Sequence, residues 1–365
     1  MRLCMKQTIF HFIIYACITG SLSSCENEIP YNPEQKAPLL IMNALLDAGE
    51  TENFVYLNLS GTGGIGHVDD ATVTLTVNGK VTETLEELPP LKPVGNPDSD
   101  NPLNFIPEIN KRKKFRIHTA LQPGDVVRLE AVAEKSKYHV SAEVNVPQPI
   151  STIHVDTTRI LLKSYGSWNA YLQFKINMQD RKGEKNYYRL DIRQDITVYG
   201  QDIAGKDTII YMRNTEFINR EDIILTDGNP ISSDNDNNDF FGTDIKNKYN
   251  VFNDSRFTDT GCTLKVYTSL YNNNEPPHIH NVSRRSKTFT VRLLSITEAE
   301  YRYLKALNFI ESDDYESALV EPVIIPSNVK NGLGFVGASS ETRVILKLPD
   351  EITDNNNPAT TDRSI

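Results

Sequence analysis

Alternation of apolar and polar residues recurs along this chain, and its two-residue period predicts β-strands. The clearest case is Ala71–Val77, which is followed directly by Asn78-Gly79 and a second short run from Lys80. An Asn-Gly pair favours a type I′ hairpin because both residues tolerate a positive φ. Further strands are predicted at 39–46, 54–59, 114–119, 127–133 and 138–146. About seven short strands in this stretch predict an immunoglobulin-like β-sandwich over residues 38–147.

A domain boundary is predicted at Val146-Pro-Gln-Pro149, because two closely spaced prolines stiffen a linker and do not suit a central strand. A larger β-rich domain is expected over 150–349. Its predicted strands are 151–157, 171–178, 187–198, 208–212, 263–270, 288–296 and 343–348. One helix is predicted at 298–310, where apolar residues recur at helical spacing after the candidate N-caps Ser295 and Thr297. The mainly β fold class therefore includes one helix in the C-terminal half.

The first 24 residues have the three parts of an export signal: a basic start, an apolar run of about ten residues, and small residues before Cys25. The run is about half of the ~20 residues that a membrane-spanning helix needs. Leu22-Ser-Ser-Cys25 resembles a bacterial lipobox, which implies acylation of Cys25, for example with palmitate. Residues 25–37 are then a polar tether, and Glu26 and Glu28 resemble a surface-export signal. The alternative for Cys25 is an ordinary cysteine that follows a plain secretory signal. The alternative for Glu26 and Glu28 is a solvated tether whose charges carry no export signal.

The formal net charge of −10 makes this chain a poor candidate for nucleic-acid binding, which requires a basic face. Of four cysteines, two leave with the signal and one carries lipid, so Cys262 alone remains in the mature body. Cys262 opens an alternating run, which favours a buried strand cysteine over a reactive thiol.

No catalytic motif occurs in the sequence, and no cofactor is expected. Asp234, Asp236 and Asn238 offer oxygen atoms at alternate positions, but the glycine and glutamate of an EF-hand loop are missing. A calcium site and a solvated loop are the two alternative interpretations of this stretch. His278 and His280 would share one face of an extended segment, but zinc usually takes three or four ligands. No metal site is therefore predicted, and the tail 354–365 is expected to be disordered.

Two long inserts, 89–107 and 226–250, are the predicted places for ligand or partner contact, because loops vary at low cost to the core. The second contains Phe240 and Phe241 among Asp and Asn residues. Exposed aromatic residues with a polar rim are typical of binding surfaces. The alternative is that both rings anchor the loop to its own domain.

The lipobox, the Asp180–Leu190 stretch, the helix with Tyr301 and Tyr303, and the Glu321–Gly337 stretch together resemble the Bacteroidota outer-membrane lipoproteins called domain of unknown function 4249. The resemblance implies a lipid-anchored outer-membrane protein that faces the cell exterior, with a TonB-dependent transporter as its partner in the capture or uptake of an extracellular ligand. We expect a non-enzymatic binding or accessory role. A surface hydrolase of glycosidase type and a structural or adhesive surface protein remain alternatives.

Overall fold

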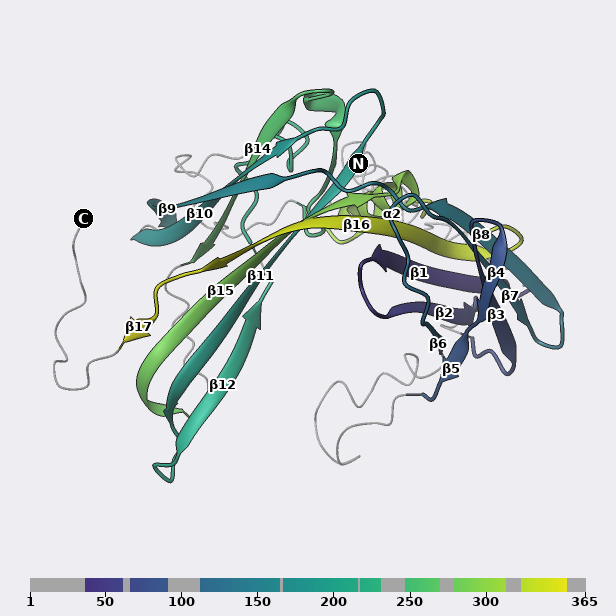
Figure 1. The fold of residues 1–365 in the computed structure, drawn as a ribbon, viewed down its shortest axis with the longest axis horizontal. Coiled ribbons are helices and arrows are strands. Elements are labelled where there is room, and N and C mark those ends of the chain that lie inside the picture. Colours follow the sequence, from purple (N-terminus) through teal and green to yellow (C-terminus); the bar gives the residue numbers. More distant parts are fainter. Residues whose placement is uncertain are drawn as a thin grey trace, which may run out of the picture. The chain divides into compact units, whose positions relative to one another are not determined.

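The computed structural model describes residues 37–61, 66–90, 112–164, 167–215, 217–230, 247–269, 279–312 and 323–352. These residues fold mainly as β-strands, with one α-helix in the C-terminal half (Figure 1), which confirms the predicted fold class. Immunoglobulin-like topology in the first part stays a prediction. The strands before residue 147 are β1 (Leu40–Ala48), β2 (Asn53–Leu59), β3 (Ala71–Val77), β4 (Lys80–Thr84), β5 (Glu86–Leu88), β6 (Lys113–Ile117), β7 (Val126–Ala133) and β8 (Tyr138–Asn145).

The later strands, apart from β17, lie in the region predicted as the larger domain. They are β9 (Ile153–Ser164), β10 (Ser167–Gln179), β11 (Tyr187–Gln201), β12 (Asp207–Asn214), β13 (Val251–Asn253), β14 (Gly261–Ser269), β15 (His280–Ile296), β16 (Leu333–Lys347) and β17 (Glu351–Ile352). A ten-stranded sheet has the path β12-β11-β15-β16-β1-β2-β6-β5, with β13 and β17 beside it. The other two sheets are β4-β3-β7-β8 and β14-β10-β9.

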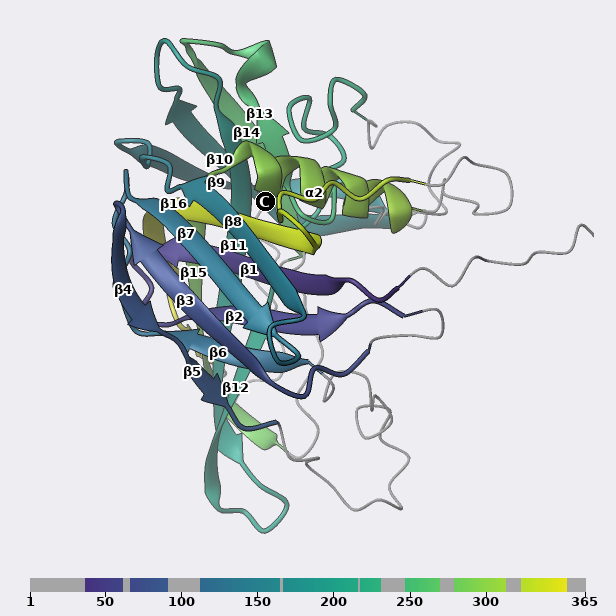
Figure 2. The ribbon, with the colours of Figure 1, turned by 90° about the vertical axis from the view of Figure 1, so that its right-hand side faces the viewer.

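The sheet β4-β3-β7-β8 is built from the alternating strands that the sequence predicts (Figure 2). Its inward residues, such as Val73 and Leu129, are fully buried in one core with residues of β1, β2 and β6. The β3–β4 turn has Asn78 at φ 52° and Gly79 at φ 77°, as a type I′ turn requires. The predicted hairpin is therefore confirmed.

Strand β16 joins segments that are far apart in the sequence. It pairs in parallel with β1 and antiparallel with β15, so one sheet contains strands from both predicted domains. Val336 and Ala338 of β16 are buried in the same core as β1 and β7. The prediction placed a strand only at 343–348, whereas β16 starts ten residues earlier. The two-domain division itself stays a prediction.

A second core lies between the small sheet β14-β10-β9 and strands β11 and β15. Phe174 of β10 packs edge-on against Phe289 of β15, with ring centroids 5.0 Å apart, and against Phe217 at 5.8 Å. Cys262 of β14 lies half-buried beside this core, and burial raises the pKa of its thiol to about 12. A thiol in this environment is not a nucleophile at neutral pH.

Helix α2 (Glu298–Ile310) has the bounds that the sequence predicts. Thr297 is the N-cap, and its hydroxyl accepts from the backbone N–H of Glu300 at 3.3 Å. The other candidate cap, Ser295, lies inside β15. Leu304 and Leu307 of the helix pack with Leu294 and Ile296 of β15, so the apolar face of α2 covers the sheet.

Candidate functional site

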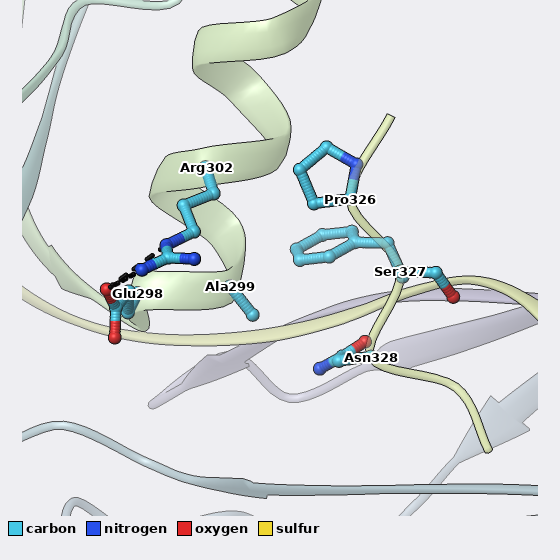
Figure 3. A pocket seen from close by; sticks show the side chains of 7 residues that line it. Glu298, Ala299, Arg302, Pro326, Ser327 and Asn328 are labelled. Carbon is cyan, nitrogen blue, oxygen red and sulfur yellow. Dashed lines mark hydrogen bonds and ion pairs between the residues drawn. The ribbon is translucent and has the colours of Figure 1, made fainter. Parts of the chain in front are cut away.

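Two adjoining hollows lie at the start of α2, and together we call them the α2 groove. The larger has a volume of about 630 Å³ and is lined by Glu143–Gln148, by the loop before β11, by Ile296–Ala299 and by Asn328. The smaller, of about 270 Å³, shares Glu298, Ala299 and Asn328 with it. Figure 3 shows Pro326, Ser327 and Asn328 opposite the first turn of the helix. A groove of this size falls within the usual range of ligand sites.

A buried hydrogen-bond hub fixes the loop between β10 and β11, which forms one wall. The backbone N–H of Asn186 donates to Asp254 at 2.7 Å, and its side-chain amide donates to Asp180 at 3.2 Å. Asp180 also accepts from the Tyr188 hydroxyl at 2.7 Å and from the Asp259 N–H at 2.9 Å. None of the buried side-chain N and O atoms of these residues lacks a partner in the described part of the chain, and a satisfied network of this kind is expected to stiffen the wall.

The predicted inter-domain linker forms a second wall, and it is held in place. Arg181 donates from its guanidinium to the carbonyl of Gln148 at 2.6 Å. Ser340 and Thr342 of β16 donate from their hydroxyls to the carbonyls of Pro147 and Ile150, each at 2.6 Å. Hydrogen bonds within the chain therefore hold this segment along β16.

The third wall is the N-terminus of α2. The Thr297 N–H donates to the Ala338 carbonyl at 3.0 Å, which places the first turn against β16. The first N–H groups of a helix have no intrahelical partner and carry partial positive charge. Glu298, in this first turn, forms an ion pair with Arg302 at 2.7 Å, as Figure 3 shows.

Two titratable groups of the lining, Tyr187 and Glu298, lie side by side. The Tyr187 hydroxyl is buried without a hydrogen-bond partner of ordinary geometry in the described residues, and burial raises its pKa. It lies beside the Glu298 carboxylate and is the largest cause of a lowered pKa at Glu298. Glu298 is therefore ionised at neutral pH. An ionised carboxylate accepts hydrogen bonds, attracts cations and can take up a proton, but it cannot donate one.

Glu300 lies behind the groove, in the first turn of α2. Its side chain is buried, one carboxylate oxygen has no partner in the described part of the chain, and the other lies 3.9 Å from Arg189. Desolvation raises the pKa of Glu300 to about 8; the charge of Arg189 opposes this shift and Asp47 adds to it. The folded protein thus holds a proton here that the unfolded chain releases above pH 4.5.

We expect Glu300→Gln to remove a pH dependence of stability. Because the folded pKa is raised, the contribution of Glu300 to wild-type stability is full below about pH 4.5 and is lost as pH rises towards 8. At pH 8.5 the variant should exceed the wild type by roughly 3 kcal/mol in unfolding free energy, and at pH 5 the two should be close. Urea unfolding at both pH values measures this. Glu298→Gln is the exposed control, with an expected change below about 0.5 kcal/mol; a pH slope retained in Glu300→Gln would contradict the assignment.

Most of the site residues predicted from sequence lie outside the described residues. These are Cys25, Glu26, Glu28, Asp234, Asp236, Asn238, Phe240, Phe241 and His278. His280 is the exposed first residue of β15. Within the described ranges, no group of three or more His, Cys, Asp or Glu residues could hold a metal ion. The lipidation, contact and weak metal candidates stay predictions.

Sequence reasoning missed the α2 groove, although one signal pointed to it. Two stretches that carry the family resemblance, Asp180–Leu190 and Glu321–Gly337, supply part of its lining, together with the start of α2. Their meeting point depends on the pairing of β16, which no local pattern shows.

Comparisons with other proteins place the chain in a family without assigning an activity. None of the helices in the described residues has the length and apolar character to span a membrane. No curated protein matches the chain. A solved structure of a DUF4785 family protein from Legionella pneumophila is similar at 10% identity with a TM-score of 0.21, covering 70% of this chain and 52% of that one. This chain thus spans about half the length of that protein.

A family model for a domain of unknown function, DUF4249, matches residues 26–345. That range includes α2, the segments that line the groove and the strands of all three sheets. It leaves out only the last two residues of β16 and the whole of β17. The match agrees with the resemblance drawn from the sequence. The chain belongs to the DUF4249 family.

Proposed function

We propose that this chain is a membrane-tethered binding protein that recognises its ligand or partner in the α2 groove. The observation that carries the proposal is the rigid construction of the groove: a buried hub, a pinned linker and a capped helix hold its three walls. Preorganised walls lower the entropy cost of binding. The ionised Glu298 offers a ligand a hydrogen-bond acceptor and a negative charge.

The tether in this proposal is the acylated Cys25, which anchors the body to the outer membrane and, with Glu26 and Glu28, directs it to the cell surface. The partner that we propose is a TonB-dependent transporter, for which this chain captures or presents a ligand. Support comes from the leader, the lipobox-like Leu22–Cys25 and the acidic residues that follow it. Stable anchoring requires two or more acyl chains.

Replacement of Cys25 by alanine tests the anchor. We expect the variant to lose label from a palmitate analogue and to move from the outer-membrane fraction to the soluble fraction. Cys262→Ala is the matched control, because the Cys262 thiol is half-buried in β14 and should affect neither property. Label that persists in Cys25→Ala would contradict the anchor.

Co-purification tests the partner. The wild-type chain, extracted from outer membrane in mild detergent, is expected to retain a transporter of the TonB-dependent class. Ala299→Arg places a long cation into the α2 groove and should release it, whereas Tyr211→Arg on the exposed strand β12 should not. If Ala299→Arg retains as much transporter as Tyr211→Arg, the groove is excluded as the contact site.

A further inference from the structure

One edge of strand β8 is open where it borders the α2 groove. On its other side β8 pairs with β7, and the hydrogen bonds of Val146 show which residues point towards β7: its N–H donates to Asp125 at 2.8 Å and its carbonyl accepts from Gly124 at 2.8 Å. In an antiparallel pair the direction alternates along the strand. The N–H and C=O groups of Ser141, Glu143 and Asn145 therefore point away from β7.

Ser141 already uses these outward groups in a short antiparallel bridge. It exchanges backbone hydrogen bonds with Lys330, at 3.3 and 2.7 Å. The chain then leaves the β8 edge, because the Asn328 side chain is bound to the backbone of Val336 at 2.7 and 2.9 Å. No backbone hydrogen bond within the described residues reaches the outward groups of Glu143 and Asn145, so the ladder that Lys330 begins stops at the groove.

The open edge has the spacing of a peptide backbone. Outward groups on alternate residues of a strand lie about 6.8 Å apart, which is the repeat of an added antiparallel strand. Both Glu143 and Asn145 line the larger hollow, so an incoming strand has room beside them. Strand addition of this kind draws affinity from main-chain hydrogen bonds and specificity from side chains.

Charge on this edge indicates what the added strand carries. Glu143 is exposed, and none of the ion pairs in the described part of the chain involves it. A residue directly opposite on a paired strand lies within about 5.5 Å, and opposite charges at such positions stabilise the pair. A lysine or arginine facing Glu143 fits this position.

We propose that the α2 groove binds an extended peptide segment of a partner protein, antiparallel to β8, with a basic residue opposite Glu143. The peptide exchanges backbone hydrogen bonds with Glu143 and Asn145 and continues the line that Lys330 begins. The inference rests on the proposed role of the α2 groove as a recognition site and adds the class of ligand.

Selection from a phage-displayed library of random twelve-residue peptides on the purified full chain provides the probes. We expect the selected peptides to carry alternating β-branched residues and at least one lysine or arginine. Asn145→Pro removes one outward N–H without touching the β7 ladder, because proline is tolerated at such an edge position. It should weaken binding about tenfold, while Asn145→Ala, which keeps the N–H, should bind like the wild type.

Two further measurements keep the test independent of how well the proline variant folds. The backbone N–H groups of an added strand point alternately towards β8 and away from it. N-methylation of the set that faces β8 should abolish binding to the wild type, and N-methylation of the other set should leave binding unchanged. Glu143→Lys should lower the affinity for the basic peptides at least tenfold at low salt, and this variant should prefer acidic peptides. No selected peptide, equal binding to Asn145→Pro and Asn145→Ala, or indifference to N-methylation would each overturn the inference. Transporter co-purification is read separately, so its failure leaves this result interpretable.

Discussion

Replacing Gly334 with alanine is expected to cost about 4 kcal/mol of unfolding free energy. Gly334 opens β16 at φ +109°, and a Cβ there would overlap the backbone of Met42, its partner on β1. Both the backbone conformation and the space exclude a side chain, and such combined strain falls in the upper range of single substitutions. The parallel β1–β16 pairing starts at this point, so the N- and C-terminal parts of the ten-stranded sheet should separate more readily.

Urea unfolding monitored by circular dichroism measures this loss. Gly183→Ala is the matched control, because Gly183 also has a positive φ (80°) but nothing within 4 Å of the added Cβ. It should lose only about 1–2 kcal/mol, the cost of the left-handed conformation. Similar losses of unfolding free energy in the two variants would contradict the close approach of β1 and β16 at Gly334.

The second large effect is expected at Arg292. Its guanidinium, on β15, donates to Asp47 of β1 at 2.6 Å and to Asp191 of β11 at 3.2 Å, and it also binds Glu341 of β16. The Arg292 side chain is only 12% exposed. Arg292→Met would leave these carboxylates together without their cation, which costs about 3–5 kcal/mol for a buried charge group.

Acid should relieve part of that loss. Burial already raises the pKa of Asp47, and the charge of Arg292 opposes the rise. Without Arg292 the pKa rises further, so the variant is penalised most at neutral pH and less as these carboxylates take up protons. Thermal melts at pH 7 and pH 4.5 compare the two conditions. Arg302→Met, in an exposed pair on α2, should lose under about 0.5 kcal/mol at either pH; a loss of that size in Arg292→Met would refute the network.

Local sequence patterns predicted the elements that have one buried apolar face and one exposed polar face. The hairpin at Asn78-Gly79 and the helix at 298–310 both follow from alternation, turn chemistry and a cap, and the structure has them at the predicted residues. Asn331 and Gly334, which have positive φ angles of 60° and 109°, are of residue types that tolerate this conformation. Each of these features depends on residues within about one turn or one strand of each other.

The first half of β16 was missed for a physical reason. Phe335–Ser340 are buried without a break, because α2 lies on one face of the strand and the core that includes β1 and β7 lies on the other. A strand covered on both faces shows no alternation. Its parallel partner β1 lies about 290 residues away, and the groove walls depend on that pairing. No pattern within one segment carries this information.

In vivo photo-crosslinking tests the central claim that the α2 groove is the recognition site of a membrane-tethered protein. A photoreactive residue replaces Glu184, whose half-exposed side chain lines the groove, or Tyr211, which is 76% exposed on β12. The account predicts an adduct with an outer-membrane transporter from position 184 and none from position 211. An adduct from position 211 alone, or from neither position in cells that contain the transporter, would contradict it.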